Sequence, residues 1–282
     1  MAHPPIVLTT DFGLSDPYAG VMKGVVLSIN PAAYLIDLTH QIQPQNIRQG
    51  SFVLAASHRF FPESSIHVAV VDPGVGTDRR AVLLVTPTAR FLAPDNGLLS
   101  GVLGDYLDTH PLNAERVNLP SSLTAYHLTK SEYWLHPVIN TFHGRDIFAP
   151  VAGHLSLGVT PADLGRPIQD LTWLPTPKPT QDGTYLLGEV IYADHYGNLV
   201  TNITVGELAG ATKILVEIKG RKIQGLSQTF QSPENNNNNN DEGLLALGGS
   251  LGFLEIAVQN GSAALVLNAE PGERVRVSFT RS

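Results

Sequence analysis

Residues 6–30 read IVLTTDFGLSDPYAGVMKGVVLSIN, a short apolar run followed by a longer stretch of helical character. Residues 6–10 are rich in apolar and β-branched side chains, which predicts a strand. In residues 18–29 apolar side chains recur at helical spacing, which predicts a helix that Asn30 and Pro31 end. A strand joined to a helix in this order is the repeating unit of an α/β fold.

The same alternation continues through the first half of the chain. The predicted strands are residues 34–38, 66–71, 81–85 and 90–93, and a second helix is predicted over residues 47–59. Strands that are apolar almost throughout are buried on both faces. We therefore expect an N-terminal, mostly parallel sheet with flanking helices.

The second half of the chain has a different pattern. A proline-rich linker is predicted over residues 171–184, between an N-terminal α/β domain (1–170) and a C-terminal domain (185–282). Short strands separated by Gly and Asn predict a small antiparallel β-barrel, with strands at 188–193, 199–203, 213–218, 252–258, 263–267 and 274–279. The asparagine tract 235–240 is interpreted as a surface insertion.

Composition excludes several classes of function. The chain of 282 residues has 18 Lys and Arg against 25 Asp and Glu, a net charge of −7, which disfavours nucleic acid as a partner. It contains no Cys, so disulfides, thiolate metal sites and cysteine nucleophiles are ruled out. No run of 18 apolar residues and no basic, apolar leader is present, so we expect no membrane partner and a cytoplasmic location.

Carboxylates follow three of the predicted strands. They are Asp11, Asp72 and Asp95, and each is succeeded within two residues by Gly or Pro. The carboxyl ends of parallel strands meet at one edge of a sheet, where α/β proteins bind their ligands. The alternative is that each Asp only caps its own turn.

A second polar segment, residues 141–146, reads TFHGRD. His143 is a candidate proton carrier because imidazole titrates near neutral pH. The alternative is a helix start with an Arg145–Asp146 ion pair. Arg79 and Arg80 either serve a site or face solvent.

Other familiar motifs lack their context. Residues 248–252 (GGSLG) match a nucleophile elbow, but no His follows His195 and a hydrolase triad needs one there. Residues 11–13 (DFG) lack the upstream elements of a kinase, and no Walker A sequence is present. A metal site from Asp11, His40, Asp72 and His143 lacks close ligand spacing, so we expect no metal.

Taken together, eight segments resemble one known family in the same order along nearly the whole chain. They are TDFG (10–13), DPY (16–18), MKG (22–24), VDPGVG (71–76), APDNG (93–97), TFHGRD (141–146), DHYGN (194–198) and GFLEIA (252–257). The set resembles the S-adenosylmethionine hydroxide adenosyltransferase family, which is related to the fluorinase and chlorinase enzymes. The resemblance implies an α/β domain, a β-barrel, and a homotrimer whose active sites lie between the first domain of one subunit and the second of its neighbour.

The implied reaction converts S-adenosylmethionine and water to adenosine and methionine, without a cofactor. The resemblance implies that Asp72, Arg79 and His143 hold the water or hydroxide. Asp11 would accept the ribose hydroxyls, Asp194 and Ser250 would contact the methionine part, and Asn198 and residues 258–260 would face adenine. The full predicted set of substrate-binding residues is Asp11, Asp16, Thr141, Phe142, Asp194, Tyr196, Asn198, Ser250, Phe253, Val258 and Asn260.

Two alternatives stay open: a halide-dependent 5′-halo-adenosine synthase and a non-catalytic protein that binds adenosyl ligands. The halogenating relatives carry Tyr where this chain has Asp72, and the fluorinase has Ser at the position of Gly144. A carboxylate repels a halide but accepts a hydrogen bond from water, which favours hydrolysis. Leu251 stands where the fluorinase has an Arg. The sequence leaves the preferred sulfonium epimer open, and the (R) form is one alternative.

Overall fold

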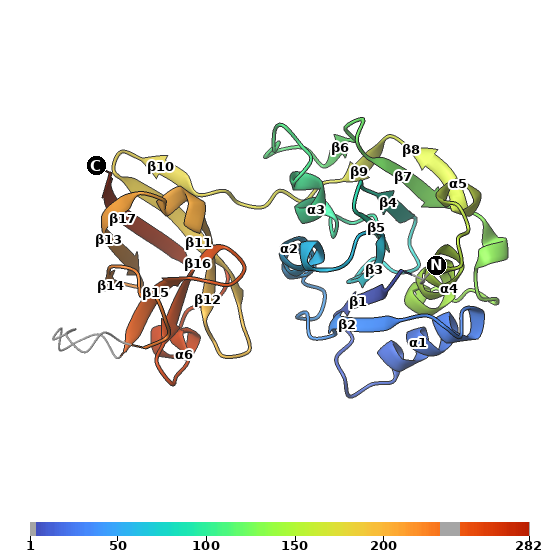
Figure 1. Cartoon of the computed structure of the whole chain (residues 1–282), viewed down its shortest axis with the longest axis horizontal. Coiled ribbons are helices and arrows are strands. Elements are labelled where there is room, and N and C mark those ends of the chain that lie inside the picture. Colours follow the sequence, from blue (N-terminus) through green and yellow to red (C-terminus); the bar gives the residue numbers. More distant parts are fainter. Residues whose placement is uncertain (1–3, 232–242, 282) are drawn as a thin grey trace. The chain divides into compact units, whose positions relative to one another are not determined.

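The computed structural model describes residues 4–231 and 243–281, and the asparagine tract 235–240 lies outside these residues. The chain divides into two compact units, residues 1–176 and 177–282. In Figure 1 the first unit runs from blue to yellow-green and the second from yellow to red. The stretch between the last strand of the first unit and the first strand of the second contains Pro175, Pro177 and Pro179.

The N-terminal unit is built on a seven-stranded sheet in the order β2-β1-β3-β5-β4-β7-β8. Its strands are β1 (Ile6–Thr10), β2 (Leu35–Thr39), β3 (Ser65–Val70), β4 (Ala81–Val85), β5 (Ala89–Pro94), β7 (Thr124–Leu128) and β8 (Gly165–Ile168). Neighbours among β2, β1, β3 and β5 are parallel. The pairs β5–β4, β4–β7 and β7–β8 are antiparallel, so the sheet is mixed, and its parallel part carries the predicted strand ends.

Helices cover both faces of this sheet (Figure 1). They are α1 (Tyr18–Ile29), α2 (Ile47–Ser57), α3 (Ser100–Gly104), α4 (Ala149–Ser156) and α5 (Pro161–Leu164), with 3-10 turns at His58–Phe60 and Ser131–Tyr133 and a π-helical turn at Gly144–Phe148. On β3, Val68 joins the core that includes residues of α1 and α4, while Ala69 joins the core with residues of α2 and α3. This alternation explains why the strands are apolar on both faces. No helix in the described part of the chain could span a membrane.

The C-terminal unit is a nearly closed antiparallel barrel in the order β14-β13-β17-β11-β12-β16-β15, with β10 paired to β11. The strands are β10 (Thr180–Asp182), β11 (Tyr185–Ala193), β12 (Leu199–Thr204), β13 (Ala211–Ile218), β14 (Arg221–Gln224), β15 (Leu244–Gly248), β16 (Phe253–Val258) and β17 (Arg274–Arg281), and a 3-10 turn spans Val205–Leu208. A further pair in the N-terminal unit joins β6 (Arg116–Asn118) to β9 (Asp170–Thr172). Both β9 and β10 include residues of the predicted linker.

The prediction of a strand at residues 263–267 is wrong, because Ala263–Leu267 forms helix α6. The Ser262 hydroxyl accepts a hydrogen bond from Leu265 N at 3.2 Å, which caps the helix at its start. Asn268 ends the helix in the left-handed conformation at φ 46°. A five-residue apolar run fits a buried strand and a buried helix equally well, and here the flanking residues decide.

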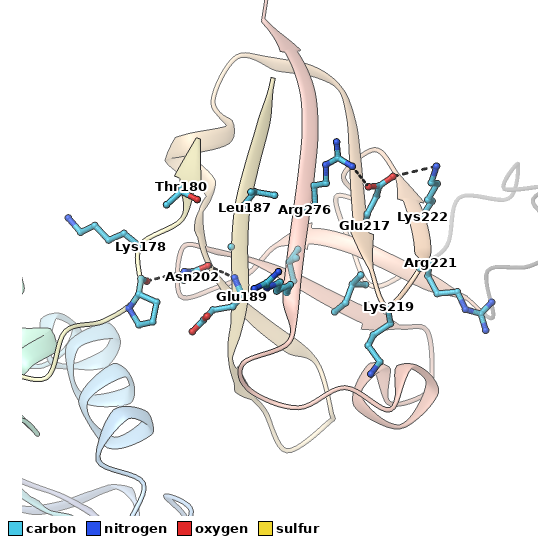
Figure 2. A pocket seen from close by; sticks show the side chains of 16 residues that line it. Lys178, Thr180, Leu187, Glu189, Asn202, Glu217, Lys219, Arg221, Lys222 and Arg276 are labelled. Atoms are coloured by element: carbon cyan, nitrogen blue, oxygen red, sulfur yellow. Dashed lines mark hydrogen bonds and ion pairs between the residues drawn. The ribbon is translucent and has the colours of Figure 1, made fainter. Parts of the chain in front are cut away.

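A groove of about 710 Å³ lies on the outside of the barrel (Figure 2). Cross-strand ion pairs line it, with Glu217 accepting from Lys222 at 3.4 Å and from Arg276 at 3.3 Å. The Arg276 guanidinium also lies 3.5 Å from the centre of the Tyr185 ring. The 16 residues around the groove include none of the predicted substrate-binding residues.

The buried His67 on β3 is expected to make the stability of the fold sensitive to acid. It is fully buried and stacked on Phe91 with ring centres 5.0 Å apart, and neither ring nitrogen has a hydrogen-bond partner in the described structure. Burial, and to a lesser extent nearby His58, lowers the pKa of His67 from 6.5 to about 4. Between these values the unfolded chain takes up a proton that the folded chain does not, so stability falls as pH falls.

We expect His67 to contribute no loss above pH 6.5 and a loss of about 3 kcal/mol in unfolding free energy by pH 4, at 1.36 kcal/mol for each pKa unit. Urea titrations of the wild type and of His67→Phe at several pH values isolate this contribution, because the two proteins share every other titratable group. Equal dependence on pH in the two proteins would contradict the assignment.

Candidate active site

The parallel strands β1 and β3 deliver two of the predicted carboxylates to one edge of the sheet. Asp11 directly follows β1, Asp72 lies two residues after β3, and both side chains line a pocket of about 410 Å³. The same pocket is lined by Thr141, Phe142 and His143 from the segment before α4. Five of the predicted site residues therefore meet in the N-terminal unit.

Arg79 joins Asp72 to His143. Its Nε lies 3.0 Å from each Asp72 carboxylate oxygen, and its Nη2 lies 2.5 Å from Asp72 Oδ2. The same Nη2 lies 2.8 Å from His143 Nδ1. The side chains of Arg79 and Asp72 are only 9% and 5% exposed, so this pair is largely shielded from water. Asp72 and Arg79 lie seven residues apart and His143 follows 64 residues after Arg79, and the three side chains form one continuous polar contact.

The loop between Asp72 and Arg79 depends on Gly76. This residue has φ 80°, which is the left-handed region that disfavours a side chain. A Cβ atom there would lie 2.3 Å from the backbone oxygen of Asn140, just ahead of the segment that carries His143. Glycine at this position therefore lets the two segments approach closely.

The contact with Arg79 determines the tautomer of the neutral His143 ring. A guanidinium only donates hydrogen bonds, so Nδ1 must be the acceptor and the neutral ring carries its hydrogen on Nε2. Burial and the charge of Arg79 lower the pKa of His143, against opposing contributions from Asp72 and Asp146. His143 therefore stays neutral to lower pH than an exposed histidine and presents an Nε2–H donor.

The Arg145–Asp146 pair beside His143 is structural. Asp146 is fully buried, accepts from Arg145 Nε at 2.6 Å and from Ile139 N at 2.9 Å, and so holds the segment ahead of α4 in place. The alternative interpretation of an ion pair is correct for these two residues. It does not extend to His143, which turns toward Arg79.

Aromatic rings form one wall of the pocket. Phe12, Tyr18 and Phe142 make three edge-to-face contacts with ring centres 5.3–5.8 Å apart. The Asp11 Oδ2 atom accepts a hydrogen bond from Gln45 N at 2.8 Å. Asp16 is exposed and does not line the pocket. Tyr18 and Gln45 were not among the predicted binding residues.

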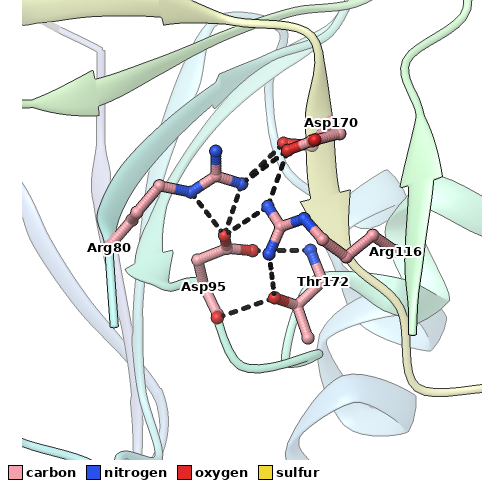
Figure 3. A network of polar contacts seen from close by, with 5 residues as sticks. All are labelled: Arg80, Asp95, Arg116, Asp170 and Thr172. Atoms are coloured by element: carbon pink, nitrogen blue, oxygen red, sulfur yellow. Dashed lines mark hydrogen bonds and ion pairs between the residues drawn. The ribbon is translucent and has the colours of Figure 1, made fainter. Parts of the chain in front are cut away.

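Asp95, the third strand-end carboxylate, belongs to a separate network shown in Figure 3. Its Oδ2 accepts from Arg80 Nε at 2.7 Å and from Arg116 Nη2 at 3.1 Å, and its Oδ1 accepts from Thr172 N at 2.7 Å. Both arginines also bind Asp170. The network ties β4 and β5 to the β6–β9 pair, so Arg80 and Asp95 are structural and Arg80 does not simply face solvent.

The remaining predicted residues lie in the C-terminal unit. Asp194 organises the turn from β11 to β12, since its Oδ1 accepts from Tyr196 N and Asn198 N at 2.9 Å each and its Oδ2 accepts from Asn198 Nδ2 at 2.9 Å. Tyr196 is 75% exposed. This turn thus presents an ordered carboxylate and an exposed ring.

The other four predicted residues of the C-terminal unit lie near the two ends of strand β16. Ser250 precedes it in the β15–β16 turn and Phe253 begins it, whereas Val258 ends it and Asn260 follows with φ 56°. Leu199 pairs with Ile256, so Asn198 lies toward the Val258 end of the strand. The residues predicted to face adenine therefore lie together, and Ser250 and Phe253 lie toward the other end.

The described residues, 4–231 and 243–281, contain no group of three His, Asp or Glu side chains arranged to hold a metal ion. His40, considered above as a ligand, bonds instead to Thr10 and Asp37.

Comparison with known proteins assigns both halves of the chain to the family that the sequence motifs resemble. The models of the SAM hydroxide adenosyltransferase N-terminal and C-terminal domains match residues 6–165 and 188–276. The chain is 37% identical to the (R)-S-adenosyl-L-methionine hydrolase of Salinispora arenicola, over 99% of each chain. A fluorinase of an Actinoplanes species is more distant, at 27% identity over 71% of this chain and 72% of the relative.

A solved structure supports the fold. The crystal structure of an uncharacterized conserved protein from Thermotoga maritima superposes with a TM-score of 0.83 at 33% identity, covering 97% of this chain and 99% of that one. Three findings agree on the family. They are the two domain models, which together span most of the chain, the full-length relative above 30% identity and the shared fold. The chain belongs to the S-adenosylmethionine hydroxide adenosyltransferase family.

Proposed function

We propose that this protein hydrolyses S-adenosylmethionine to adenosine and L-methionine, with Asp72, Arg79 and His143 as its catalytic residues. The observation that carries the proposal is the contact of Arg79 with both Asp72 and His143, two residues that line the same pocket as Asp11. Membership of the family and the relative named as an (R)-S-adenosyl-L-methionine hydrolase support the choice of substrate.

The chemistry requires little besides a well-placed nucleophile. Attack at C5′ expels a neutral thioether, so the leaving group needs no general acid. A water molecule that donates a hydrogen bond to Asp72 and accepts one from His143 Nε2–H is held by two groups of known polarity. Positioning of this kind is worth roughly 7–11 kcal/mol when the reacting atoms are aligned.

Arg79 completes the arrangement by fixing both partners of the water. Its guanidinium holds the Asp72 carboxylate through two nitrogens and orients the His143 ring through Nδ1. As the water loses its proton to Asp72, the developing hydroxide lies beside the Nε2–H donor and the Arg79 charge. Both stabilise it more than they stabilise neutral water.

Halogenation is the competing reaction, and two features disfavour it. The Asp72 carboxylate repels a halide at the position where water is held. A side chain at Gly144 would begin 3.1 Å from Met22 Sδ and from Phe142 Cε2, so a serine there requires both neighbours to shift. Incubation with S-adenosylmethionine and chloride, followed by chromatography, is expected to yield adenosine and no 5′-chloro product. A 5′-chloro product, or binding without turnover, contradicts the proposal.

The substrate epimer, assembly and location are parts of the same proposal. We propose the (R)-sulfonium epimer as substrate because the relative from Salinispora arenicola is named an (R)-S-adenosyl-L-methionine hydrolase. Separate assays of the two epimers test this. We propose a homotrimer, since the predicted residues are divided between the two units, and light scattering should give three times the 30.3 kDa chain mass. A cytoplasmic location fits a chain without cysteine.

A pair of substitutions at His143 tests its role as a donor. His143→Ala removes the Nε2–H group and is expected to lower turnover about 10²-fold. His143→Gln retains an N–H donor at nearly the same reach, so we expect a loss of about tenfold or less. The measurement is the rate of adenosine release at saturating substrate. Equal losses in the two variants would contradict the role of His143 as a donor.

A further inference from the structure

A buried chain of hydrogen bonds lies behind Asp11 and connects the ends of β1 and β2. Thr10 Oγ1 lies 2.8 Å from His40 Nδ1, and His40 Nε2 lies 3.0 Å from Asp37 Oδ1. Lys23 Nζ from α1 donates to Asp37 Oδ2 at 2.5 Å. Thr10 is fully buried and His40 is 3% exposed, so water does not compete for the inner bonds.

The chemistry of the partners fixes the direction of each bond. The Asp37 carboxylate accepts from Lys23 and from His40 Nε2–H, which leaves Nδ1 as an acceptor in the tautomer that carries its hydrogen on Nε2. The Thr10 hydroxyl then donates to Nδ1, and its oxygen accepts from Phe12 N at 3.3 Å. Every polar atom of the His40 ring has a partner, which is what a buried imidazole requires.

The same segment fixes the backbone on both sides of Asp11. Gly13 N donates to the His40 backbone oxygen at 2.7 Å, and Ile42 N donates to the Thr10 backbone oxygen at 3.3 Å. The Asp11 Oδ2 atom accepts from Gln45 N at 2.8 Å, where Gln45 has the left-handed φ of 65°. No bond to Asp11 Oδ1 occurs within the described residues. That oxygen is therefore held in one place with its acceptor capacity unused.

We propose that His40 is a positioning residue for Asp11, acting through Thr10 and the turn 10–13, so that Oδ1 meets the ribose hydroxyls of an adenosyl ligand. This inference rests on the proposed function and on the ribose-binding role that the family resemblance implies for Asp11. A carboxylate that is already oriented forms charge-assisted hydrogen bonds with a diol without losing further side-chain entropy. Loss of the chain releases the turn, and the penalty falls on the ribose contact.

Binding of two nucleosides, measured by calorimetry on the full chain, separates this role from general stabilisation. The ligands are adenosine and 2′,3′-dideoxyadenosine, which lacks both ribose hydroxyls. The wild type should bind adenosine at least about tenfold more tightly. Thr10→Val and His40→Leu should each weaken adenosine binding about tenfold and leave dideoxyadenosine binding within about twofold, since only the former ligand uses Asp11.

Thr9→Val is a matched control. Thr9 is the preceding residue of β1, is fully buried, and its hydroxyl has no partner within the described structure, so the exchange removes no hydrogen bond. It should leave both affinities unchanged. His40→Asn, whose amide oxygen can replace Nδ1 as acceptor for Thr10, should recover part of the adenosine affinity that His40→Leu loses.

Equal losses for both nucleosides in Thr10→Val would overturn the inference, as would unchanged adenosine affinity or a wild type that binds neither ligand. If His40→Leu fails to fold, Thr10→Val carries the test alone, because it keeps the shape of the side chain. Failure of the proposed function has a different signature. In that case the wild type binds adenosine with the expected preference but releases none from S-adenosylmethionine.

Discussion

Replacement of Asp72 by alanine is expected to lower the rate of adenosine release by about 10²- to 10³-fold. The substitution removes the acceptor for the water proton and leaves the Arg79 guanidinium, 9% exposed, without its carboxylate. Of its side-chain hydrogen bonds among the described residues, Arg79 then keeps the one to His143 Nδ1, so the geometry of the remaining donor also changes. The effect should fall on turnover more than on substrate affinity, because the carboxylate contacts the water and not the substrate.

Two companion variants make the result specific. Asp72→Asn keeps the size and one acceptor oxygen but not the charge, so it should lose nearly as much turnover as Asp72→Ala. Asp78→Ala removes an exposed carboxylate from the same loop and should leave the rate within about twofold. Near-normal turnover in Asp72→Ala, with an intact fold by circular dichroism, would remove Asp72 from the mechanism.

Replacement of Asp95 by alanine is expected to destabilise the N-terminal unit by about 2–3 kcal/mol. The Asp95 side chain is 3% exposed and receives bonds from Arg80, Arg116 and Thr172 N. Removal of the carboxylate leaves two neighbouring guanidiniums and a backbone N–H without this partner. Both guanidiniums keep Asp170 as a partner, so the expected effect comes from the partly buried Thr172 N–H, which loses its acceptor, and from the second carboxylate that each arginine loses.

Denaturant titration followed by a probe in the N-terminal unit measures this change, and Arg116 supplies the contrast. The Arg116 side chain is 42% exposed, so Arg116→Ala should cost no more than about 1 kcal/mol because solvent screens its ion pairs. A cost for Asp95→Ala as small as that for Arg116→Ala would mean that the network is solvated and does not hold β5 to the β6–β9 pair.

The sequence predicts the parts of this fold that depend on local pattern. The helix at Tyr18–Ile29 and the strand at Ile6–Thr10 are observed with their predicted bounds, because apolar periodicity and the following Asn30-Pro31 act locally. The error at Ala263–Leu267 arose where a short apolar run gave no periodicity to read. The antiparallel half of the N-terminal sheet depends on long-range pairing such as β4 with β7, which no local pattern encodes.

The site divides in the same way. The edge that holds Asp11 and Asp72 follows from strand order, whereas the separation of Asp95 depends on Arg80 and Arg116 meeting it in three dimensions. Gln45 gave no signal, since it contributes a backbone N–H at a left-handed φ and not a side chain. His40 was visible only as a candidate metal ligand, because its partners Thr10 and Asp37 are identified by geometry alone.

The shared guanidinium of Arg79 also constrains how enzymes of this family can diverge. A single exchange of Asp72 for the tyrosine expected in halogenating relatives would strand a shielded positive charge beside a neutral ring. Conversion of a water-using enzyme into a halide-using one is therefore expected to require changes at positions 72 and 79 together. Intermediates that carry only one of the two changes should form a fitness valley.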